Sequence, residues 1–272
     1  MIVVLEPIGK MIMFTLKEIL EKTACSELTV EEAEKLVRLQ AIAELEGIAR
    51  IDCNREHRNG VPEIILAENK TVQDVVEISM KMLETNGRVI ISRCTPQHIE
   101  ALNAAVPTEA ICQVNQKAKM VIIKKKNYTF VNSGGKIGLL TAGTSDIPVA
   151  EEAKVIAEEM GCIVYTGYDL GVAGIHRLLE PLKDLIIKDV DVLVVVAGRE
   201  GALPSVVAGM VNVPVIAVPT SNSYGFGEKG VSTLMAMLQS CSLGMAVVNI
   251  DSGVAAGAVA TLIANRVAKF RK

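Results

Sequence analysis

The sequence contains no tryptophan, and aromatic residues make up only 3% of its 272 residues. Proteins that bind single-stranded nucleic acid stack bases on aromatic side chains, and few such side chains are available here. Positive charge is also scarce: 28 Lys and Arg residues face 31 Asp and Glu residues, and the net charge is −3. Because a nucleic-acid surface needs a basic patch or stripe, we expect no nucleic-acid partner.

Paired cysteines and clustered histidines are absent as well. The six cysteines contain no Cys-x-x-Cys pair, and the three histidines stand alone at positions 57, 98 and 176. This spacing excludes the usual structural zinc motifs. Six scattered cysteines in a chain of this length do not resemble a disulfide framework. Reduced thiols are the simpler interpretation, and they predict a cytoplasmic protein.

The sequence also lacks a long, uninterrupted apolar run. The first ten residues are apolar, but the stretch is short and includes Glu6, so we expect no signal peptide. The longest uncharged run, residues 201–227, contains Pro204, Pro214 and Pro219, which disfavour a membrane-spanning helix. We therefore expect no membrane association.

What the sequence does have is aliphatic side chains. Hydrophobic residues make up 50% of the chain, enough for a sizeable core. A polar, glycine-containing segment, KKKNYTFVNSGGK (124–136), separates two apolar regions. We therefore predict two domains, at residues 1–128 and 129–272.

The second region alternates between strands and helices. Its apolar runs are KIGLLTAG, CIVYTGYD, DVLVVVAG, PVIAVPT and AVVNID, each followed by a segment with helical periodicity. Near-continuous apolar strands that alternate with amphipathic helices indicate a parallel sheet covered on both faces. We predict an α/β fold: a doubly wound, three-layer αβα sandwich of five strand–helix units.

The first region is less regular and predicts a smaller α/β domain. Helical periodicity is found at residues 15–23, 30–47, 71–85 and 96–105. PEIILAE, RVIISR and KMVIIKK have the composition of strands, and IDCNREHRNG (51–60) that of a polar loop.

Residues suited to ligand binding gather after the predicted strands of the second region. The five strand ends are TAGTSD, GYDLGVAGIHR, AGREGALPS, PTSNSYGFGEKG and NIDSG. In an open parallel sheet, ligands bind at the carboxyl ends of the strands, where small residues and helix N-termini accommodate phosphate. The sequence predicts one site with these contacts: Gly143, Thr144, Ser145, Asp146, His176, Arg177, Glu200, Gly201, Ser205, Ser221, Tyr224, Asn249 and Asp251.

Plainer interpretations compete at each reactive side chain. Asp146 has an alternative role as a helix cap, and His176 as a surface residue at a helix start. Glu200 follows the most apolar strand, where a carboxylate is costly unless it caps a helix or meets a ligand cation. Cys241 has an alternative role as a small, buried apolar residue. GFGEKG (225–230) matches the dinucleotide pattern GxGxxG, but its position favours a flexible turn.

Several motifs carry a family resemblance. GKIGLLTAGTSD, GVAGIHRLL, VVVAGREGALPSVVAGM and LQSCSLGMAVVNIDSG resemble the aminoimidazole ribonucleotide carboxylase fold family. More closely, they resemble the LarB family, the pyridinium-3,5-biscarboxylic acid mononucleotide synthases of nickel-pincer cofactor biosynthesis. IDCNREHRNGVPEIILAENKT (51–71) is similar to the Asp-Arg-Arg-Gly-Pro-Glu stretch of that family.

The resemblance implies a reaction between nicotinic acid adenine dinucleotide and carbon dioxide or bicarbonate. The pyridinium ring is carboxylated at C5, and the pyrophosphate is hydrolysed to release AMP. An electron-poor pyridinium carbon cannot attack carbon dioxide until a thiolate adds at C4 or C6. By the family motif that thiolate belongs to Cys241, with Asp146, His176 and Glu200 as further catalytic residues.

The predicted fold separates Cys241 from those residues. Helices in such a fold run antiparallel to the strands, so a residue at the end of the fourth helix lies at the opposite edge of the sheet. We therefore expect a neighbouring subunit to supply the thiol. The fold family commonly forms octamers, which leads us to expect a homo-octamer.

The chain departs from the purine carboxylases at two positions. Ala202 replaces the histidine of their Ala-His-Leu-Pro motif, and Cys241 stands where they typically have proline. Both changes argue against the imidazole ribonucleotide reaction. Two alternatives stay open: a purine-type ribonucleotide carboxylase or mutase, and a non-catalytic nucleotide-binding module.

The basic residues of the first region have two interpretations. Arg55 and Arg58 either contact the pyrophosphate of the dinucleotide or belong to a solvated loop. No resident cofactor is firmly predicted. Mg²⁺ on the pyrophosphate is compatible with the hydrolysis step, but the sequence contains no dedicated set of carboxylate ligands.

Overall fold

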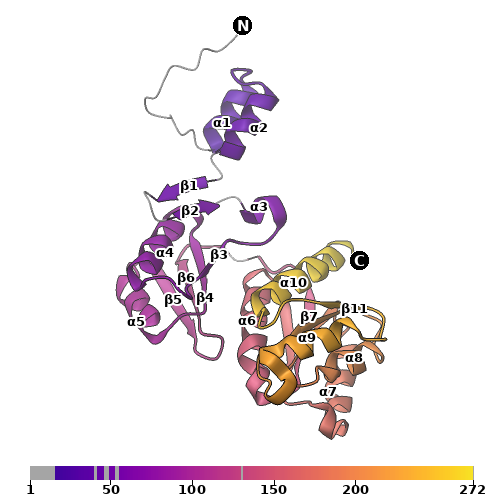
Figure 1. Ribbon diagram of the computed structural model, residues 1–272. Coiled ribbons are helices and arrows are strands. Elements are labelled where there is room, and N and C mark those ends of the chain that lie inside the picture. Colours follow the sequence, from indigo (N-terminus) through magenta and orange to yellow (C-terminus); the bar gives the residue numbers. More distant parts are fainter. Residues whose placement is uncertain (1–15, 40–41, 46–48, 53–54, 130, 272) are drawn as a thin grey trace.

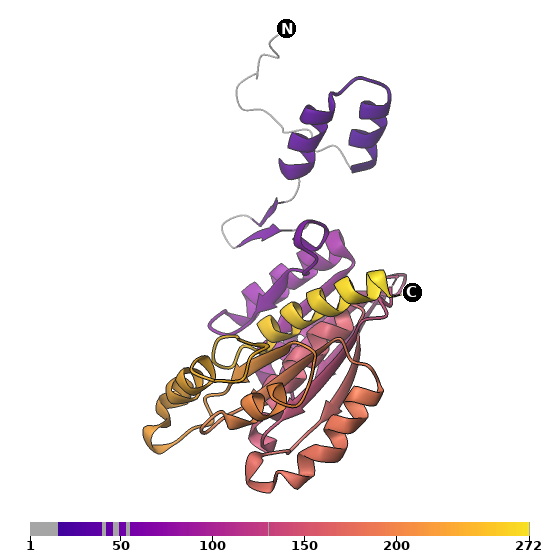
Figure 2. The same cartoon turned by 90° about the vertical axis from the view of Figure 1, so that its right-hand side faces the viewer.

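The computed structural model describes residues 16–39, 42–45, 49–52, 55–129 and 131–271. Helices α1 (Leu16–Ala24) and α2 (Val30–Leu39) pack on each other and stand apart from the rest of the chain (Figures 1 and 2). Strands β1 (Ile42–Leu45) and β2 (Ala49–Asp52) form an antiparallel pair, which helix α3 (Arg55–Asn59) follows.

Two predictions for this segment were wrong. The helix expected over residues 30–47 ends at Leu39, because the residues after it form β1, where Ala43 lies opposite Ile51 of β2. Over so few residues, the spacing of apolar side chains does not distinguish the end of an amphipathic helix from a short alternating strand. The loop expected over residues 51–60 contains the end of β2 and all of α3.

A four-stranded sheet forms the centre of the first domain. Its order is β3 (Ile64–Leu66), β4 (Arg88–Ser92), β6 (Met120–Lys125) and β5 (Ala110–Asn115), and only β3 and β4 are parallel. Helices α4 (Val72–Asn86) and α5 (Pro96–Ala105) cover one face. Thr71 and Thr95 cap these helices by accepting backbone N–H bonds. The edge strand β5, in which Ile111 is exposed, was not predicted.

The second domain is built on a five-stranded parallel sheet, as predicted. The order is β11 (Met245–Val247), β10 (Val215–Pro219), β9 (Val192–Ala197), β7 (Lys136–Thr141) and β8 (Ile163–Gly167). All six residues of β9 are buried, which explains its unbroken apolar sequence. The predicted boundary at residues 128 and 129 falls between β6 and β7 and stays a prediction.

Helices cover both faces of this parallel sheet. Helices α6 (Ile147–Glu159) and α10 (Gly253–Phe270) lie on one face, packed through alanines such as Ala153 and Ala260. Helices α7 (His176–Ile187), α8 (Ala202–Ala208) and α9 (Val231–Leu238) lie on the other. Three 3₁₀ turns occupy strand ends: η1 (Thr144–Asp146), η2 (Val172–Gly174) and η3 (Gly225–Gly230).

Helix α6 is shared by the two domains. One side of it packs on the parallel sheet, and the other buries Val155, Ile156 and Met160 against Ile90 and Met120 of the first sheet. Figure 1 shows α6 and α10 between the two sheets. The layers are therefore α4/α5, the first sheet, α6/α10, the parallel sheet and α7/α8/α9. An apolar core of this kind fixes the domains relative to each other.

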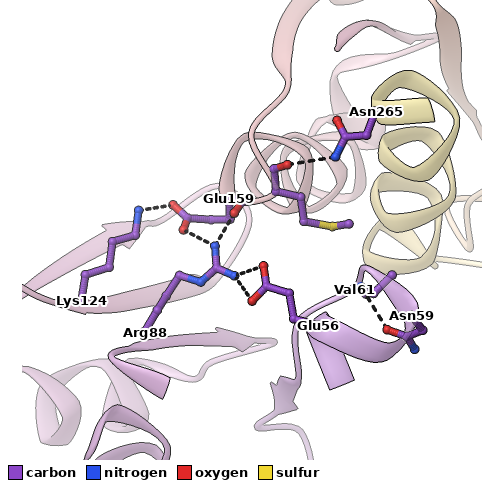
Figure 3. Close-up of polar contacts among 8 residues, drawn as sticks. Glu56, Asn59, Val61, Arg88, Lys124, Glu159 and Asn265 are labelled. Carbon is purple, nitrogen blue, oxygen red and sulfur yellow. Dashed lines mark hydrogen bonds and ion pairs between the residues drawn. The ribbon is translucent and has the colours of Figure 1, made fainter. Parts of the chain in front are cut away.

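Buried charges reinforce this contact (Figure 3). The Arg88 side chain on β4 is only 4% exposed, and its Nη2 donates to both carboxylate oxygens of Glu56 at 2.8 Å. Its Nη1 donates to the backbone carbonyl of Glu159, and Lys124 Nζ lies 2.7 Å from Glu159 Oε1. The end of α6 is therefore joined to α3, β4 and β6 by a network in which buried charges are paired.

Candidate active site

A cavity of about 300 Å³ opens where the strand order of the parallel sheet reverses. Strands β7 and β9 are neighbours here, and the chain leaves them toward opposite faces. A doubly wound sheet places its ligand crevice at such a switch point. The cavity is lined by Ala197, the last residue of β9, and by residues that follow β7, β8, β9 and β10: Ala142, Gly143, Ser145, Asp146, Gly171, Val172, Ala173, Gly198, Arg199, Glu200, Ala202, Leu203 and Asn222.

Asp146 is the buried carboxylate of this cavity. Its Oδ2 accepts a 2.9 Å hydrogen bond from the Gly143 backbone N–H, and its Oδ1 accepts one of 2.7 Å from the Thr220 hydroxyl. Asp146 occupies the N-cap position of α6, but its side chain makes no capping bond to that helix. The carboxylate instead joins the loops after β7 and β10. The bond from Gly143 caps η1, the turn that leads into α6, and the predicted catalytic role of Asp146 stays a prediction.

Glu200 lines the same cavity, after β9. The cost of burial expected for it does not arise, because the side chain is exposed. Its backbone neighbours Arg199 and Gly201 both have positive φ angles, which turn the chain sharply before α8. No hydrogen-bond partner of the Glu200 carboxylate is found in the described part of the chain. It is thus free to meet a ligand in the cavity that it lines.

Arg199 was not predicted as a site residue, yet it lines the same cavity. Its guanidinium lies 4.0 Å from the centroid of the Tyr224 ring, a cation–π contact that holds both side chains beside the site. Asn222, also unpredicted, donates from Nδ2 to the Ser145 carbonyl at 2.7 Å. Both residues lie in strand-end motifs that the sequence already identified: Arg199 stands beside Glu200 in AGREGALPS, and Asn222 stands beside Ser221 in PTSNSYGFGEKG. These motifs could therefore have predicted them.

His176 and Arg177 begin α7 at the rim of the site. Both side chains are exposed, and neither lines the cavity. Arg177 Nη1 donates to Asp169 Oδ2 at 2.8 Å, an ion pair that places its charge near Gly171 in the cavity wall. His176 is therefore farther from the cavity than the sequence predicted, whereas Arg177 flanks it.

The remaining predicted contacts divide into two groups. Thr144, Gly201, Ser221, Tyr224, Asn249 and Asp251 lie at the carboxyl edge of the sheet, and the Ser221 backbone N–H donates to Asp251 Oδ1 at 2.9 Å. Ser205 instead faces away along α8, with its hydroxyl 2.8 Å from that of Ser240. Arg55 lies on α3 and pairs with Glu63 at 2.9 Å, while the Arg58 side chain lies outside the described residues.

Cys241 lies outside the cavity, as the topology predicts. It follows α9 in the segment whose Gly244 carbonyl accepts a bond from the Val215 backbone N–H at the amino end of β10. Its neighbour Ser240 contacts Ser205 in the middle of α8, and the cavity reaches only the first turn of that helix. Cys241 is exposed, which contradicts its alternative role as a buried apolar residue.

The other described cysteines differ from Cys241 in their surroundings. Burial raises the pKa of Cys94 to about 12, and it also raises the pKa values of Cys112 and Cys162. Thiols with raised pKa values stay protonated near neutral pH and are poor nucleophiles. Cys25 is exposed but follows α1, far along the chain from the parallel sheet. Among the described residues, Cys241 is thus the accessible thiol of the second domain.

The described residues contain no group of three or more His, Cys, Asp or Glu side chains placed to hold a metal ion. No resident metal is firmly predicted, and Mg²⁺ bound to the substrate phosphates stays compatible with the hydrolysis step. Of the helices in the described ranges, none is both long and apolar enough to cross a membrane.

Two family models match the chain in succession. The LarB/PurE-like N-terminal domain matches residues 42–126, and the AIR carboxylase domain matches residues 136–270. The uncharacterized protein MJ0165 of Methanocaldococcus jannaschii is 46% identical over 253 residues, covering 92% of this chain and 96% of that protein.

The second domain alone also resembles N5-carboxyaminoimidazole ribonucleotide mutases. The Methanocaldococcus jannaschii mutase is 31% identical over 119 residues, which cover 43% of this chain and 71% of the mutase. The Thermotoga maritima mutase is 29% identical over 108 residues, covering 38% of this chain and 59% of the mutase. The likeness to these mutases is thus confined to part of the chain.

Proposed function

Because the chain belongs to the LarB family, in which a LarB/PurE-like N-terminal domain precedes an AIR carboxylase domain, we propose that it carboxylates nicotinic acid adenine dinucleotide. Carboxylation takes place at C5 of the pyridinium ring. Hydrolysis of the pyrophosphate then releases AMP and pyridinium-3,5-biscarboxylic acid mononucleotide. The coarser assignment, a PurE/LarB-like carboxylase-family enzyme with a nucleotide-related function, rests on both domains and on the mutase relatives.

The finer proposal rests on two residue types that occur together in this chain, a cysteine at position 241 and an alanine at position 202. Cys241 is an exposed thiol beside α8, the helix whose first turn lines the cavity. Ala202 stands in that first turn where the purine carboxylases have histidine, so this wall lacks the imidazole of their motif. The chain has therefore lost a proton-transfer group and has gained a nucleophile, the change that pyridinium chemistry requires.

The proposed carboxylation has three steps. The Cys241 thiolate adds to C4 or C6 of the pyridinium, and the electron pair displaced from the ring makes C5 an enamine carbon. C5 then attacks carbon dioxide and forms the new carbon–carbon bond. A base removes the C5 proton, its electron pair restores the aromatic ring, and the C–S bond breaks to release the thiolate.

The cavity residues supply different parts of this scheme. Glu200 is exposed and lines the cavity, so we assign it the removal of the C5 proton. Asp146 is held by Gly143 and Thr220 and is assigned to positioning the ring. Arg177, at the rim, is the cation that favours the thiolate and the bound carboxylate.

The thiol comes from a neighbouring subunit in this proposal. The exposed face beside Cys241 is apolar: Val231, Met235 and Leu238 recur along α9, and Leu243 in the following segment is 90% exposed. Contiguous exposed apolar residues mark protein interfaces. Contact between copies through this face carries Cys241 of one subunit toward the cavity of another, in the homo-octamer expected from the fold family.

The proposed hydrolysis adds water to one phosphorus of the pyrophosphate and breaks the bond to the bridging oxygen. Arg55 and Arg58 are the proposed phosphate contacts. In the free protein Arg55 pairs with Glu63, so phosphate binding requires an exchange of partners. Mg²⁺ bound to the pyrophosphate would neutralise part of its charge.

Incubation with nicotinic acid adenine dinucleotide and ¹³C-bicarbonate tests the proposal. Mass spectrometry is expected to detect AMP together with a mononucleotide that carries one ¹³C-carboxylate. Release of AMP without label would reduce the activity to pyrophosphate hydrolysis. Absence of both products at every concentration of dinucleotide and bicarbonate tested would contradict the proposal.

A second candidate function is supported by the mutase relatives and by Asp146, which matches their Ser-Asp position. Conversion of N5-carboxyaminoimidazole ribonucleotide, followed by its absorbance, separates this candidate from the first. A non-catalytic nucleotide-binding module would bind the dinucleotide without turnover, and Cys241→Ser would leave that binding unchanged.

A further inference from the structure

Two cavities lie between the domains, on the face of the parallel sheet that α6 and α10 cover. One of about 680 Å³ opens between the β5–β6 hairpin, the start of α5 and the first turns of α6. The other, of about 450 Å³, lies between α3, β3 and α10. Arg93, Glu152 and Asp251 line both cavities, so these three side chains stand where the two meet.

The groups at this junction are charged and held in place. Arg93 Nη1 lies 2.6 Å from Glu68 Oε2, and its Nη2 donates to the Asp251 carbonyl at 3.1 Å. Glu152 is buried, its Oε1 accepts a 2.7 Å bond from the Ser92 hydroxyl, and burial raises its pKa. A carboxyl group at a cavity wall can also accept hydrogen bonds from the hydroxyl groups of a ligand.

The backbone around the larger cavity is unusual. Four of its lining residues, Asn69, Arg93, Lys119 and Asp251, have φ angles of 64°, 58°, 51° and 53°. Non-glycine residues seldom adopt this left-handed conformation, and such residues cluster at ligand-binding sites. They come from four separate loops of both domains. Their convergence on one cavity distinguishes it from an accidental gap between domains.

Only a thin wall separates this cavity from the candidate active site. Ser145 and Asp146 line the switch-point cavity, whereas Pro148 and Val149, in the first turn of α6, line the interdomain cavity. On the other side, Asn222 lines the active site, and its neighbour Ser221 donates to Asp251. The start of α6 thus lies between the two cavities.

The size of the switch-point cavity limits what it holds. Ligand sites span about 300–1,000 Å³, and the switch-point cavity, at about 300 Å³, is at the lower end, so it suits one half of a dinucleotide. The second half needs a further site within reach of the pyrophosphate. The interdomain cavity is adjacent, and its volume of about 680 Å³ exceeds what a nucleoside requires.

We propose that the larger interdomain cavity binds the adenosine half of the dinucleotide while the pyridinium half occupies the switch-point cavity. Carboxylates of Glu152 and Asp251 accept bonds from the ribose hydroxyls, as acidic residues do at other nucleotide sites. Ile99 and Val149 form an apolar wall for the purine. The pyrophosphate passes the start of α6, where the positive end of the helix dipole favours phosphate.

This assignment rests on the proposed function and gives the first domain a part in it. AMP, a product of the proposed reaction, serves as the probe, and titration calorimetry of the full chain measures its dissociation constant. Val149→Trp fills the cavity and is expected to weaken AMP binding by about tenfold or more. Glu152→Gln removes the carboxylate and is expected to weaken it by severalfold. Binding of nicotinic acid mononucleotide is expected to stay unchanged in both.

Matched controls are available on the same helix. Glu158 is exposed on α6 and lines neither cavity, so Glu158→Trp and Glu158→Gln are expected to bind AMP like the wild type. Thermal unfolding of each variant checks that α6 stays folded. If Val149→Trp fails to fold, Glu152→Gln and Gln116→Trp, at an exposed position of the cavity rim, carry the test.

The outcomes separate this assignment from the proposed function. Wild-type AMP affinity in all folded variants would overturn the adenosine site even if labelled product forms. Failure of the wild type to bind AMP would overturn it as well. Weakened AMP binding in the cavity variants alone would support the site, even if no carboxylation were detected.

Discussion

The two faces of the parallel sheet differ in what covers their helices. On one face, α6 is buried by the first domain, and its outward side contributes Val155, Ile156 and Met160 to a second apolar core. On the other face, α9 and the segment after it leave Met235, Leu238 and Leu243 exposed. Apolar residues on the outward side of a helix require a partner surface. Among the described residues, the first domain supplies that partner to α6, and no segment supplies one to α9.

The difference also separates the reactive groups. Asp146 and Glu200 line a cavity formed within one chain, whereas Cys241 lies at the end of the uncovered helix. The covered face gives the site its fixed geometry. The uncovered face carries the thiol on which the proposed chemistry depends. If the proposed chemistry holds, catalysis depends on contact between subunits.

The largest expected effect is a rescue of activity in mixed assemblies. Cys241→Ala and Asp146→Ala are each expected to abolish carboxylation. Co-assembled oligomers combine an intact cavity with an intact thiol at about a quarter of their sites if the residues come from different subunits. Rate measurements on verified mixed oligomers check this. No rescue would place Cys241 and Asp146 of one site in the same subunit.

The stability of the contact between the first domain and α6 is expected to depend on Arg88. Arg88→Ala removes the buried guanidinium that joins Glu56 to the end of α6 and leaves Lys124 as the remaining cation beside Glu159. Because Lys124 still pairs Glu159, the loss of unfolding free energy is expected near the lower end of the roughly 3–5 kcal/mol for a broken buried ion pair. Urea unfolding measures the change. The control is Lys81→Ala, which breaks an exposed pair with Glu84 and is expected to cost less than about 1 kcal/mol. Equal losses of unfolding free energy in the two variants would show that the Arg88 network does not stabilise the contact between the domains.

The uncovered face is expected to control assembly. Leu238→Glu places a charge in the exposed apolar stripe of α9 and is expected to lower the oligomeric state without lowering the thermal stability of the single chain. Light scattering after gel filtration measures the mass. Glu158→Gln on α6 also changes the charge by one unit, away from this stripe, and is expected to leave the mass unchanged.

The smallest effect concerns the pH dependence of stability at the covered face. Burial raises the pKa of Glu152 above its unfolded value, so the folded state holds this proton more tightly. The resulting stability is present below the unfolded pKa, near 4.5, and is lost as pH rises through the folded pKa. Glu152→Gln is therefore expected to gain stability relative to wild type as pH rises from 4 to 7. An unchanged difference across that range would contradict the burial argument.

The sequence predicted the parallel sheet because its inner strands β7, β9 and β10 are buried on both faces. Residues 192–197 are apolar throughout, a pattern that only a fully covered strand requires. The strand-end glycines and acids were also informative, since strand order places them at one edge. The first domain was harder to predict, because β1 and β2 are short and β5 is an edge strand with an exposed isoleucine.

The contacts between the domains could not be predicted from the sequence. Glu151, Glu152 and Glu159 have the periodicity of a solvated helix face, yet all three are buried by partners from the first domain. Periodicity reports which side of a helix is apolar and cannot report a second domain that pairs its charges. The same limit hid Arg93, whose position between two cavities depends on both domains.

Single-turnover carboxylation by Cys241→Ser is the most direct test of the central claim. The rate of ¹³C-bicarbonate incorporation into nicotinic acid adenine dinucleotide is compared with that of the wild type, with Cys25→Ser as the control. If the Cys241 sulfur activates the ring, incorporation falls on the order of 10³-fold or more in Cys241→Ser and is unchanged in the control. Incorporation at the wild-type rate without that sulfur would contradict the account.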